Sequence, residues 1–223
     1  MNGTSLMQRF TLIHDGSEQG WQTAYLAFHI AAQLGAPLQA LLGDSANRES
    51  LVQSAAQVEI GGRAAGVVIG TRLVTDFSLD NLIENTDSID GLFIPHRFVP
   101  DEKTAARFLE ALSCPLWIVS HGPEIHKMAT LISDLVADEK LIHYSMTLAH
   151  RLQQALIGFV QAKELASKSQ SDLELEWEPI PNFSSREINA TINQLDVNLF
   201  FVSASNASLI EDLASNCVIF PTL

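Results

Sequence analysis

The chain has 223 residues, of which 47% are hydrophobic and 17% charged, so it is long and apolar enough to form one large domain or two small ones. Its 26 acidic residues outnumber 13 basic ones, and the formal net charge is −13. This charge repels phosphate backbones and anionic lipid, and no run of three lysines or arginines offsets it, so we expect neither a nucleic-acid nor a membrane partner.

Strand and helix patterns alternate through the first half of the chain. Strands are predicted over residues 10–14, 38–42, 67–74, 91–95 and 115–119. Helices are expected to begin at or just after Ser17, Asp44 or Ser45, Ser78, and Asp101, and the second is expected to end near Gly61 and Gly62. Strands that are nearly continuous apolar runs are typical of a parallel sheet covered on both faces. We therefore predict an α/β fold with a doubly wound sheet.

The second half of the chain repeats this pattern in a shortened form. MATLISD (128–134) resembles FTLIHD (10–15), DVNLFFVSAS (196–205) resembles SIDGLFIPHR (88–97), and SNCVIF (215–220) resembles LSCPLWI (112–118). The difference in residue number between matching residues of the two copies decreases along the chain, which indicates a duplication followed by deletions in the second copy. Only a short polar segment, AKELASKSQSD (162–172), precedes LELEWEPI, so the second copy is expected to lack a helix there. We predict two domains, residues 1–121 and 127–223.

The first residues of the sequence and the two cysteines both indicate where in the cell the protein is found. The opening MNGTSLMQRF lacks the basic and apolar regions of an export signal, and no apolar run reaches the length of a membrane helix. Cys114 and Cys217 lie far apart in apolar contexts, so we expect buried free thiols rather than a disulfide or metal pair. We predict a cytoplasmic protein.

The ordered features of the first half resemble the universal stress protein family. These features are a first strand ending in Asp15-Gly16-Ser17, an amphipathic helix over 21–34, LGAPLQALL (34–42) and ALSCPLWIV (111–119). The resemblance covers residues 9–120 and, through the repeat, 128–223. It implies a five-stranded parallel sheet of order 3-2-1-4-5 in each copy, similar to adenine nucleotide hydrolases, and pairing of the copies through their fifth strands as an internal pseudo-dimer. It also implies a stress-response or regulatory role without a defined catalytic reaction.

The resemblance implies a nucleotide site as well, and the sequence departs from it. Members that bind ATP use an Asp after strand one and a loop with three spaced glycines after strand four, because backbone N–H groups must approach the phosphates closely. Here the first two glycine positions fall on Pro95 and Phe98, and no glycine occurs between Gly91 and Gly122. In the second copy, no glycine follows Gly158. We therefore predict no cofactor, although ATP or AMP stays open as the alternative.

One interpretation of residues 15–17 is structural. Asp15 or Ser17 caps the first helix, and Gly16 permits the tight turn. The protein is then a non-catalytic stress-response or regulatory scaffold that binds an unknown protein partner, with homo-oligomerisation left open.

The alternative interpretation is a ligand site. Asp15 would contact a nucleotide or another small molecule together with Pro95, His96 and Arg97 at the mouth of strand four, since an arginine can hold a phosphate without a glycine loop. The sequence contains no Gly-x-Ser-x-Gly, Walker loop or zinc-ligand spacing, so we predict no catalytic residue and no metal site.

Overall fold

The structure is a computed structural model that describes residues 9–43, 48–85, 90–122, 124–165, 173, 175–210 and 215–221. Its strands are β1 (Phe10–His14), β2 (Leu38–Leu42), β3 (Ile69–Leu73), β4 (Gly91–Pro95), β5 (Leu116–Val119), β6 (Lys127–Leu131), β7 (Ala155–Gln161), β8 (Glu176–Ile180), β9 (Leu199–Ser203) and β10 (Asn216–Phe220). Its α-helices are α1 (Glu18–Leu34), α2 (Arg48–Ala64), α3 (Leu79–Asn85), α4 (Glu102–Leu112), α5 (Glu139–Leu152) and α7 (Ser185–Leu195). Three 3₁₀ helices are η1 (His96–Phe98), η2 (Ala162–Glu164) and η3 (Ala204–Ile210).

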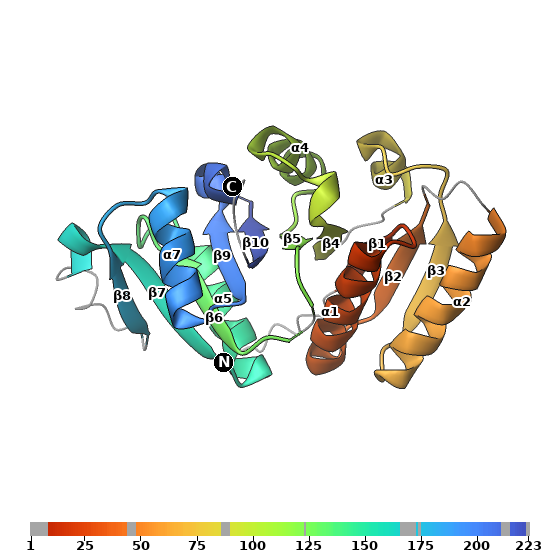
Figure 1. The fold of residues 1–223 in the computed structure, drawn as a ribbon, viewed down its shortest axis with the longest axis horizontal. Helices are drawn as coiled ribbons and strands as arrows, with labels where there is room; N and C mark the ends of the chain where they lie inside the picture. The colour runs from red at the N-terminus through yellow and green to blue at the C-terminus, as the bar shows by residue number, and fades with distance from the viewer. Residues whose placement is uncertain are drawn as a thin grey trace.

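All ten of these strands form a single sheet with the order β3-β2-β1-β4-β5-β10-β9-β6-β7-β8 (Figure 1). Neighbouring strands are parallel except for β5 and β10, which pair antiparallel with Trp117 opposite Val218. Each half therefore has the order 3-2-1-4-5, and the halves join through their fifth strands as an internal pseudo-dimer. The predicted fold class is confirmed; the boundaries 1–121 and 127–223 stay a prediction.

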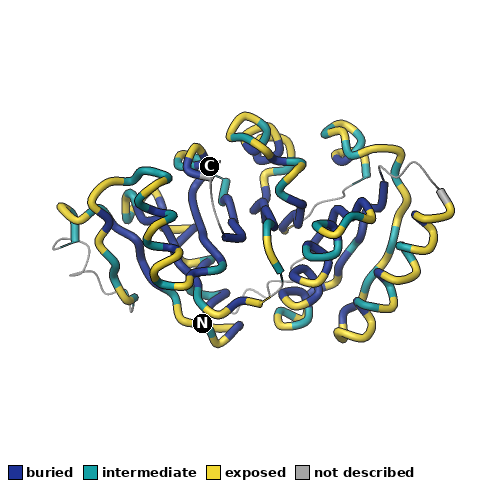
Figure 2. Tube along the Cα trace, viewed as in Figure 1, coloured by how far each residue is buried: buried dark blue, intermediate teal, exposed yellow. Residues whose placement is uncertain are grey.

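The strands lie between two layers of helices, and their side chains are almost all buried in the centre of the sheet (Figure 2). Helices α1, α2 and α5 pack their apolar sides against one face. On the opposite face lie α3, α4, α7 and η3. Because both faces are covered, the central strands β1, β4 and β9 are buried along their whole length, as their apolar sequences predict.

Helix ends follow the local sequence signals with one exception. Asp101 caps α4 by accepting a hydrogen bond from the Thr104 N–H at 2.7 Å, as expected. Helix α2 runs past Gly61 to Ala64, so its predicted end was wrong. Gly62 allows close packing instead: a Cβ there would lie 2.8 Å from Cγ2 of Ile69 on β3. The predicted caps of α2, Asp44 and Ser45, lie outside the described residues.

The second half differs from the first in its helices. Only the 3₁₀ helix η2 is described between β7 and β8, and most of the segment predicted to have lost a helix, residues 166–172, lies outside the described residues. Strand β8 lies within the LELEWEPI segment and begins at Glu176. At the position of α4, the second half has the 3₁₀ helix η3, which the sequence did not indicate.

Two asparagines fasten the connection between the halves. The Oδ1 of Asn216 accepts hydrogen bonds from the backbone N–H groups of Ser120 and His121, both at 3.0 Å. At the other end of the connection, Asn198 Oδ1 accepts from the His126 N–H at 3.0 Å. Asn216 is the first residue of β10, so the end of β5 is tied to the strand with which it pairs.

Candidate functional site

The crevice at the carboxyl ends of β1 and β4 is the place where an open parallel sheet forms its ligand site, because the chain leaves these two strands in opposite directions. Residues 15–17 connect β1 to α1, and Pro95 ends β4 immediately before η1. The structure therefore brings the sequence-predicted residues of both loops to one place.

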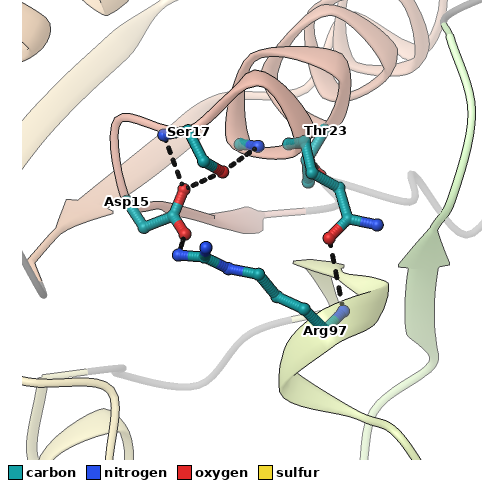
Figure 3. Close-up of polar contacts among 6 residues, drawn as sticks. Asp15, Ser17, Thr23 and Arg97 are labelled. Carbon is teal, nitrogen blue, oxygen red and sulfur yellow. Dashed lines mark hydrogen bonds and ion pairs between the residues drawn. The ribbon is translucent and has the colours of Figure 1, made fainter.

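Ser17, rather than Asp15, caps α1. Its Oγ accepts a hydrogen bond from the Gly20 N–H at 3.0 Å and donates one to Asp15 Oδ1 at 2.6 Å (Figure 3). The Ser17 N–H also donates to Asp15 Oδ1, at 3.0 Å. Gly16 has a φ of +79°, in the left-handed region that favours glycine, so the tight turn explains its presence. Asp15 thus orients the capping serine.

The other oxygen of Asp15 forms an ion pair with the guanidinium of Arg97 (Figure 3). The Asp15 side chain is fully buried, whereas 46% of the Arg97 side chain is exposed. The backbone N–H of Arg97 donates to Gln19 Oε1 at 3.3 Å, and its guanidinium carbon lies 4.8 Å from the ring centre of Phe98. Arg97 therefore reaches from η1 across the crevice and neutralises the one carboxylate that the family resemblance assigns to a ligand.

Gly20 is a site residue that the sequence reasoning missed. A Cβ at this position would lie 2.5 Å from Asp15 Oδ1 and 2.7 Å from His14 Nδ1. Contacts this short do not occur, so the first turn of α1 approaches the end of β1 only because residue 20 has no side chain. A glycine inside an otherwise helical pattern was the signal that would have pointed to it.

His14 is buried beneath the crevice. Its ring packs edge-on against Trp21, with the ring centres 4.4 Å apart. Burial lowers the pKa of His14 to about 4, because the charged imidazolium loses its hydration there. His96, at the mouth of the crevice, is half-buried, and its pKa is also lowered, first by desolvation and then by the nearby His121. His14 is therefore neutral at physiological pH and serves packing.

The turn after β4 is short and contains no glycine, unlike a phosphate loop. Pro95 ends β4 in parallel pairing with Val119, and residues 96–98 form η1 directly afterwards. Phe98 anchors the turn by packing edge-on against Phe77, with ring centres 5.2 Å apart. A proline has no N–H, and the turn offers none of the glycine conformations that let a backbone wrap a phosphate.

The corresponding crevice of the second half holds a hydrogen-bonded network of serine, aspartate and asparagine side chains. Ser133 Oγ donates to Asp138 Oδ2 at 2.9 Å and accepts from Asn206 Nδ2 at 3.4 Å. Asn206 Nδ2 also donates to Ser203 Oγ at 3.0 Å, and the hydroxyls of Ser203 and Ser205 lie 2.9 Å apart. Asp138 is 2% exposed. The network links the loops after β6 and β9 to each other.

Asp134, the sequence match of Asp15, joins this network through its backbone N–H, which donates to Asp138 Oδ2 at 3.0 Å. Its Oδ1 accepts hydrogen bonds from the N–H groups of Val136 and Ala137 at 2.8 and 2.9 Å, which closes a turn at the surface. The loop between β6 and α5 is longer than the loop between β1 and α1, so the matching sequence does not place its carboxylate at the matching point.

Other chemistry is limited within the described ranges. No group of three or more His, Cys, Asp or Glu side chains there is arranged to hold a metal ion. The same part of the chain contains no helix that is long and apolar enough to cross a membrane. Cys114 and Cys217 are buried free thiols, as expected, and burial raises the pKa of Cys114 to about 12.

Comparison with known proteins reveals a duplicated fold. No family model and no curated protein matches the sequence. Among solved structures, a functionally unknown protein from Pseudomonas aeruginosa PAO1 has a TM-score of 0.71 at 14% identity, covering 100% of this chain and 95% of its own. A universal stress protein from Archaeoglobus fulgidus DSM 4304 has a TM-score of 0.70 at 9% identity, covering 96% and 98%. The cytoplasmic domain of a prokaryotic cation chloride cotransporter has a TM-score of 0.57 at 12% identity, covering 95% and 94%. The chain therefore has the fold of a universal stress protein in its two-copy form.

Proposed function

We propose that the chain is a universal-stress-protein-like regulatory protein of the cytoplasm, which catalyses no reaction, binds no ATP and acts through contacts with a protein partner. The observation that carries this proposal is the ion pair between Asp15 and Arg97. The carboxylate that would contact a nucleoside is already fully buried and neutralised by the chain's own arginine.

The surroundings of the crevice support the same conclusion. A triphosphate needs N–H donors and positive charge, and Pro95 and the short η1 supply few free donors. Asp101 and Glu102 begin α4 just beyond η1 and add negative charge close to where phosphates would lie. In the second half, the Ser133–Asn206 network joins the two loops that a ligand would have to separate.

A nucleotide or small-molecule sensor is the second candidate. It is favoured by the meeting of Asp15 and Arg97, with His96 half-buried beside them at one crevice mouth. In this case the guanidinium of Arg97 would leave Asp15 and pair with an anionic group of the ligand. Asp15 would then accept hydrogen bonds from hydroxyl groups of the ligand.

Calorimetric titration with ATP, ADP and AMP, with and without Mg²⁺, distinguishes the two candidates. We expect no binding heat from any of the three nucleotides in the folded wild-type protein. Micromolar binding that is abolished by Asp15→Ala, but kept in the surface control Asp134→Ala, would refute the regulatory proposal and establish the sensor. Binding of AMP alone would show that the nucleoside pocket survives without a phosphate site.

A further inference from the structure

The amino-terminal part of the first-half sheet carries a hollow that is separate from the crevice. It has a volume of about 540 Å³ and is lined by residues at the start of β2, by β3 and by Arg9, which immediately precedes β1. Leu38 and Ile69 line it, but their side chains pack toward α1 and α2, so the hollow opens on the opposite face of the sheet. A Cβ added to Gly70 would meet nothing within 4 Å, so the space above this residue is open.

The hollow exists because α3 is short. Leu82 of α3 is buried in the same core as Ile13 and Leu41, so the helix covers the carboxyl ends of the strands. In the second half the corresponding helix is α7, which is longer and packs Ile188 and Ile192 over its strands. Figure 1 shows α7 alongside β7 and β9, whereas α3 lies near the upper ends of the first-half strands. Among the residues that the structure describes, this sheet face is therefore covered in one half and open in the other.

Side chains with hydrogen-bond donors lie among the residues that line the hollow, beside apolar residues. Arg9 and Arg72 lie at two corners of the hollow, and the amide of Gln39 lies between them. Thr11 is opposite Gln39 in the strand register, and Gln39 is opposite Gly70. The Thr11 hydroxyl is fully buried and has no hydrogen-bond partner. Gln39 and Gly70 therefore lie side by side in the hollow, with a gap where residue 70 has no side chain, and the buried Thr11 lies beyond its edge on β1.

The two arginines are not neutralised by the described part of the protein. Neither guanidinium forms an ion pair with a described residue, although Arg63, on the other side of β3, pairs with Glu59 at 3.1 Å. Asp90 is the acidic group near Arg9, and its Oδ2 accepts the Arg9 backbone N–H at 2.8 Å. Two arginines without an acidic partner among the described residues stand out in a chain with a net charge of −13.

The spacing of the arginines limits the ligand. Arg9 and Arg72 are two strands apart and four residues apart along the strands, so their backbones are about 16 Å from each other for ordinary strand spacing and rise. In the strand register Gln39 lies midway between the two arginines, so extended side chains that reach inward from these corners would bring their guanidinium groups together over Gln39. A compact molecule with an anionic group at each end matches this arrangement, because a guanidinium pairs best with a carboxylate or a phosphate.

We propose that this hollow is a binding site for a small organic or inorganic polyanion, in which Arg9 and Arg72 hold two anionic groups and Gln39 donates a hydrogen bond between them. The site is independent of the crevice and does not rest on the proposed function. Carboxylate and phosphate ligands share the chemistry that the hollow selects, and the experiment distinguishes them.

The test is titration of the full chain with citrate and with inorganic pyrophosphate, followed by calorimetry and by amide NMR spectra. We expect submillimolar binding of at least one probe and shifts of the Gly70 amide and the Gln39 side-chain amide. Arg9→Gln and Arg72→Gln should each weaken binding by about tenfold or more, because each removes one charge-assisted pair. Arg63→Gln is the matched control, since it removes the same charge outside the hollow, and it should leave the affinity unchanged.

Three results would overturn the proposal. The first is no binding of either probe up to about 10 mM, which is weaker than a specific two-arginine site allows. The second is equal weakening by all three arginine variants, which would reveal a general charge effect. The third is binding that neither Arg9→Gln nor Arg72→Gln alters, which would place the anion elsewhere. All three arginines are exposed, so the variants are expected to fold, and thermal unfolding checks this.

Discussion

At the scale of single residues, the crevice is held closed by groups that satisfy one another. Asp15 accepts two hydrogen bonds from Ser17 on one oxygen and pairs with Arg97 through the other. Gly20 lets the helix approach this carboxylate closely enough for Ser17 to bridge them. The described partners of this buried carboxylate offset the cost of its burial, so Asp15 needs no ligand to do so.

His14 makes the stability of this region depend on pH. Its pKa is lowered from 6.5 to about 4 in the folded chain, so the unfolded chain takes up the proton first as the pH falls. The contribution of neutral His14 is fully present above pH 6.5, decreases between 6.5 and 4, and is lost below about 4. It amounts to up to about 3 kcal/mol. NMR titration of the imidazole should give a midpoint near 4, and the pH dependence of unfolding should flatten in His14→Phe. A midpoint near the ordinary value would refute this.

At the scale of secondary-structure elements, the 3₁₀ helix η1 follows β4 at the place where the family resemblance implies a longer, glycine-containing loop. η1 leads from β4 to the Asp101 cap of α4 within a few residues, and Phe98 holds it against Phe77. The connection between the halves is likewise fixed by side chains, with Asn216 at one end and Asn198 at the other.

Asn216 offers a test of the fastened connection. Asn216→Ala removes the acceptor of the Ser120 and His121 N–H groups, and Asn216 is 1% exposed. We expect a loss of about 1–3 kcal/mol in the free energy of unfolding, because two part-buried hydrogen bonds to backbone donors are lost. Hydrogen exchange at Ser120 and His121 should become faster. Asn193→Ala, on the exposed side of α7, serves as the control and should change neither quantity; unchanged exchange in Asn216→Ala would refute the role of this side chain.

At the scale of the whole molecule, the two halves share one sheet and continuous cores. Antiparallel pairing of β5 with β10 places Trp117 of the first half near Phe201 of the second, with ring centres 6.4 Å apart. A sheet with this junction in its centre is expected to unfold as a unit, since breaking it exposes apolar surface of both halves.

Tryptophan fluorescence tests this cooperativity, because Trp21 lies in α1 and Trp177 in β8, at opposite sides of the junction. A variant that keeps only Trp21 and one that keeps only Trp177 carry the same number of tryptophan replacements and report on different halves. The unfolding transition of each variant is first measured by circular dichroism. In both variants the fluorescence transition should then coincide with the transition that circular dichroism reports for the same variant. Two separate transitions within one variant would show that the halves unfold independently.

The sequence predicted the architecture better than the site. Apolar strand runs and helical spacing predicted the order of elements, and the resemblance implied the sheet order and the fifth-strand junction. The missing glycines after β4 and the position of Arg97 beside Asp15 could also be anticipated, because both loops leave neighbouring strands. The role of Gly20, the length of the loop that carries Asp134, and the open face beside α3 depend on packing between distant segments. Local pattern does not contain that information.

Arg97 closes the first crevice by pairing with Asp15. A double-mutant cycle on the free energy of unfolding measures the strength of this pairing. Asp15→Ala, Arg97→Ala and the double variant should show a coupling of about 1–3 kcal/mol, toward the lower end because Arg97 is half exposed to water. The surface pair Glu59–Arg63 is the control, with an expected coupling of about 0.3–0.5 kcal/mol. If the losses in free energy of unfolding caused by Asp15→Ala and Arg97→Ala simply add in the double variant, the two side chains are not coupled, and Asp15 is available to a ligand.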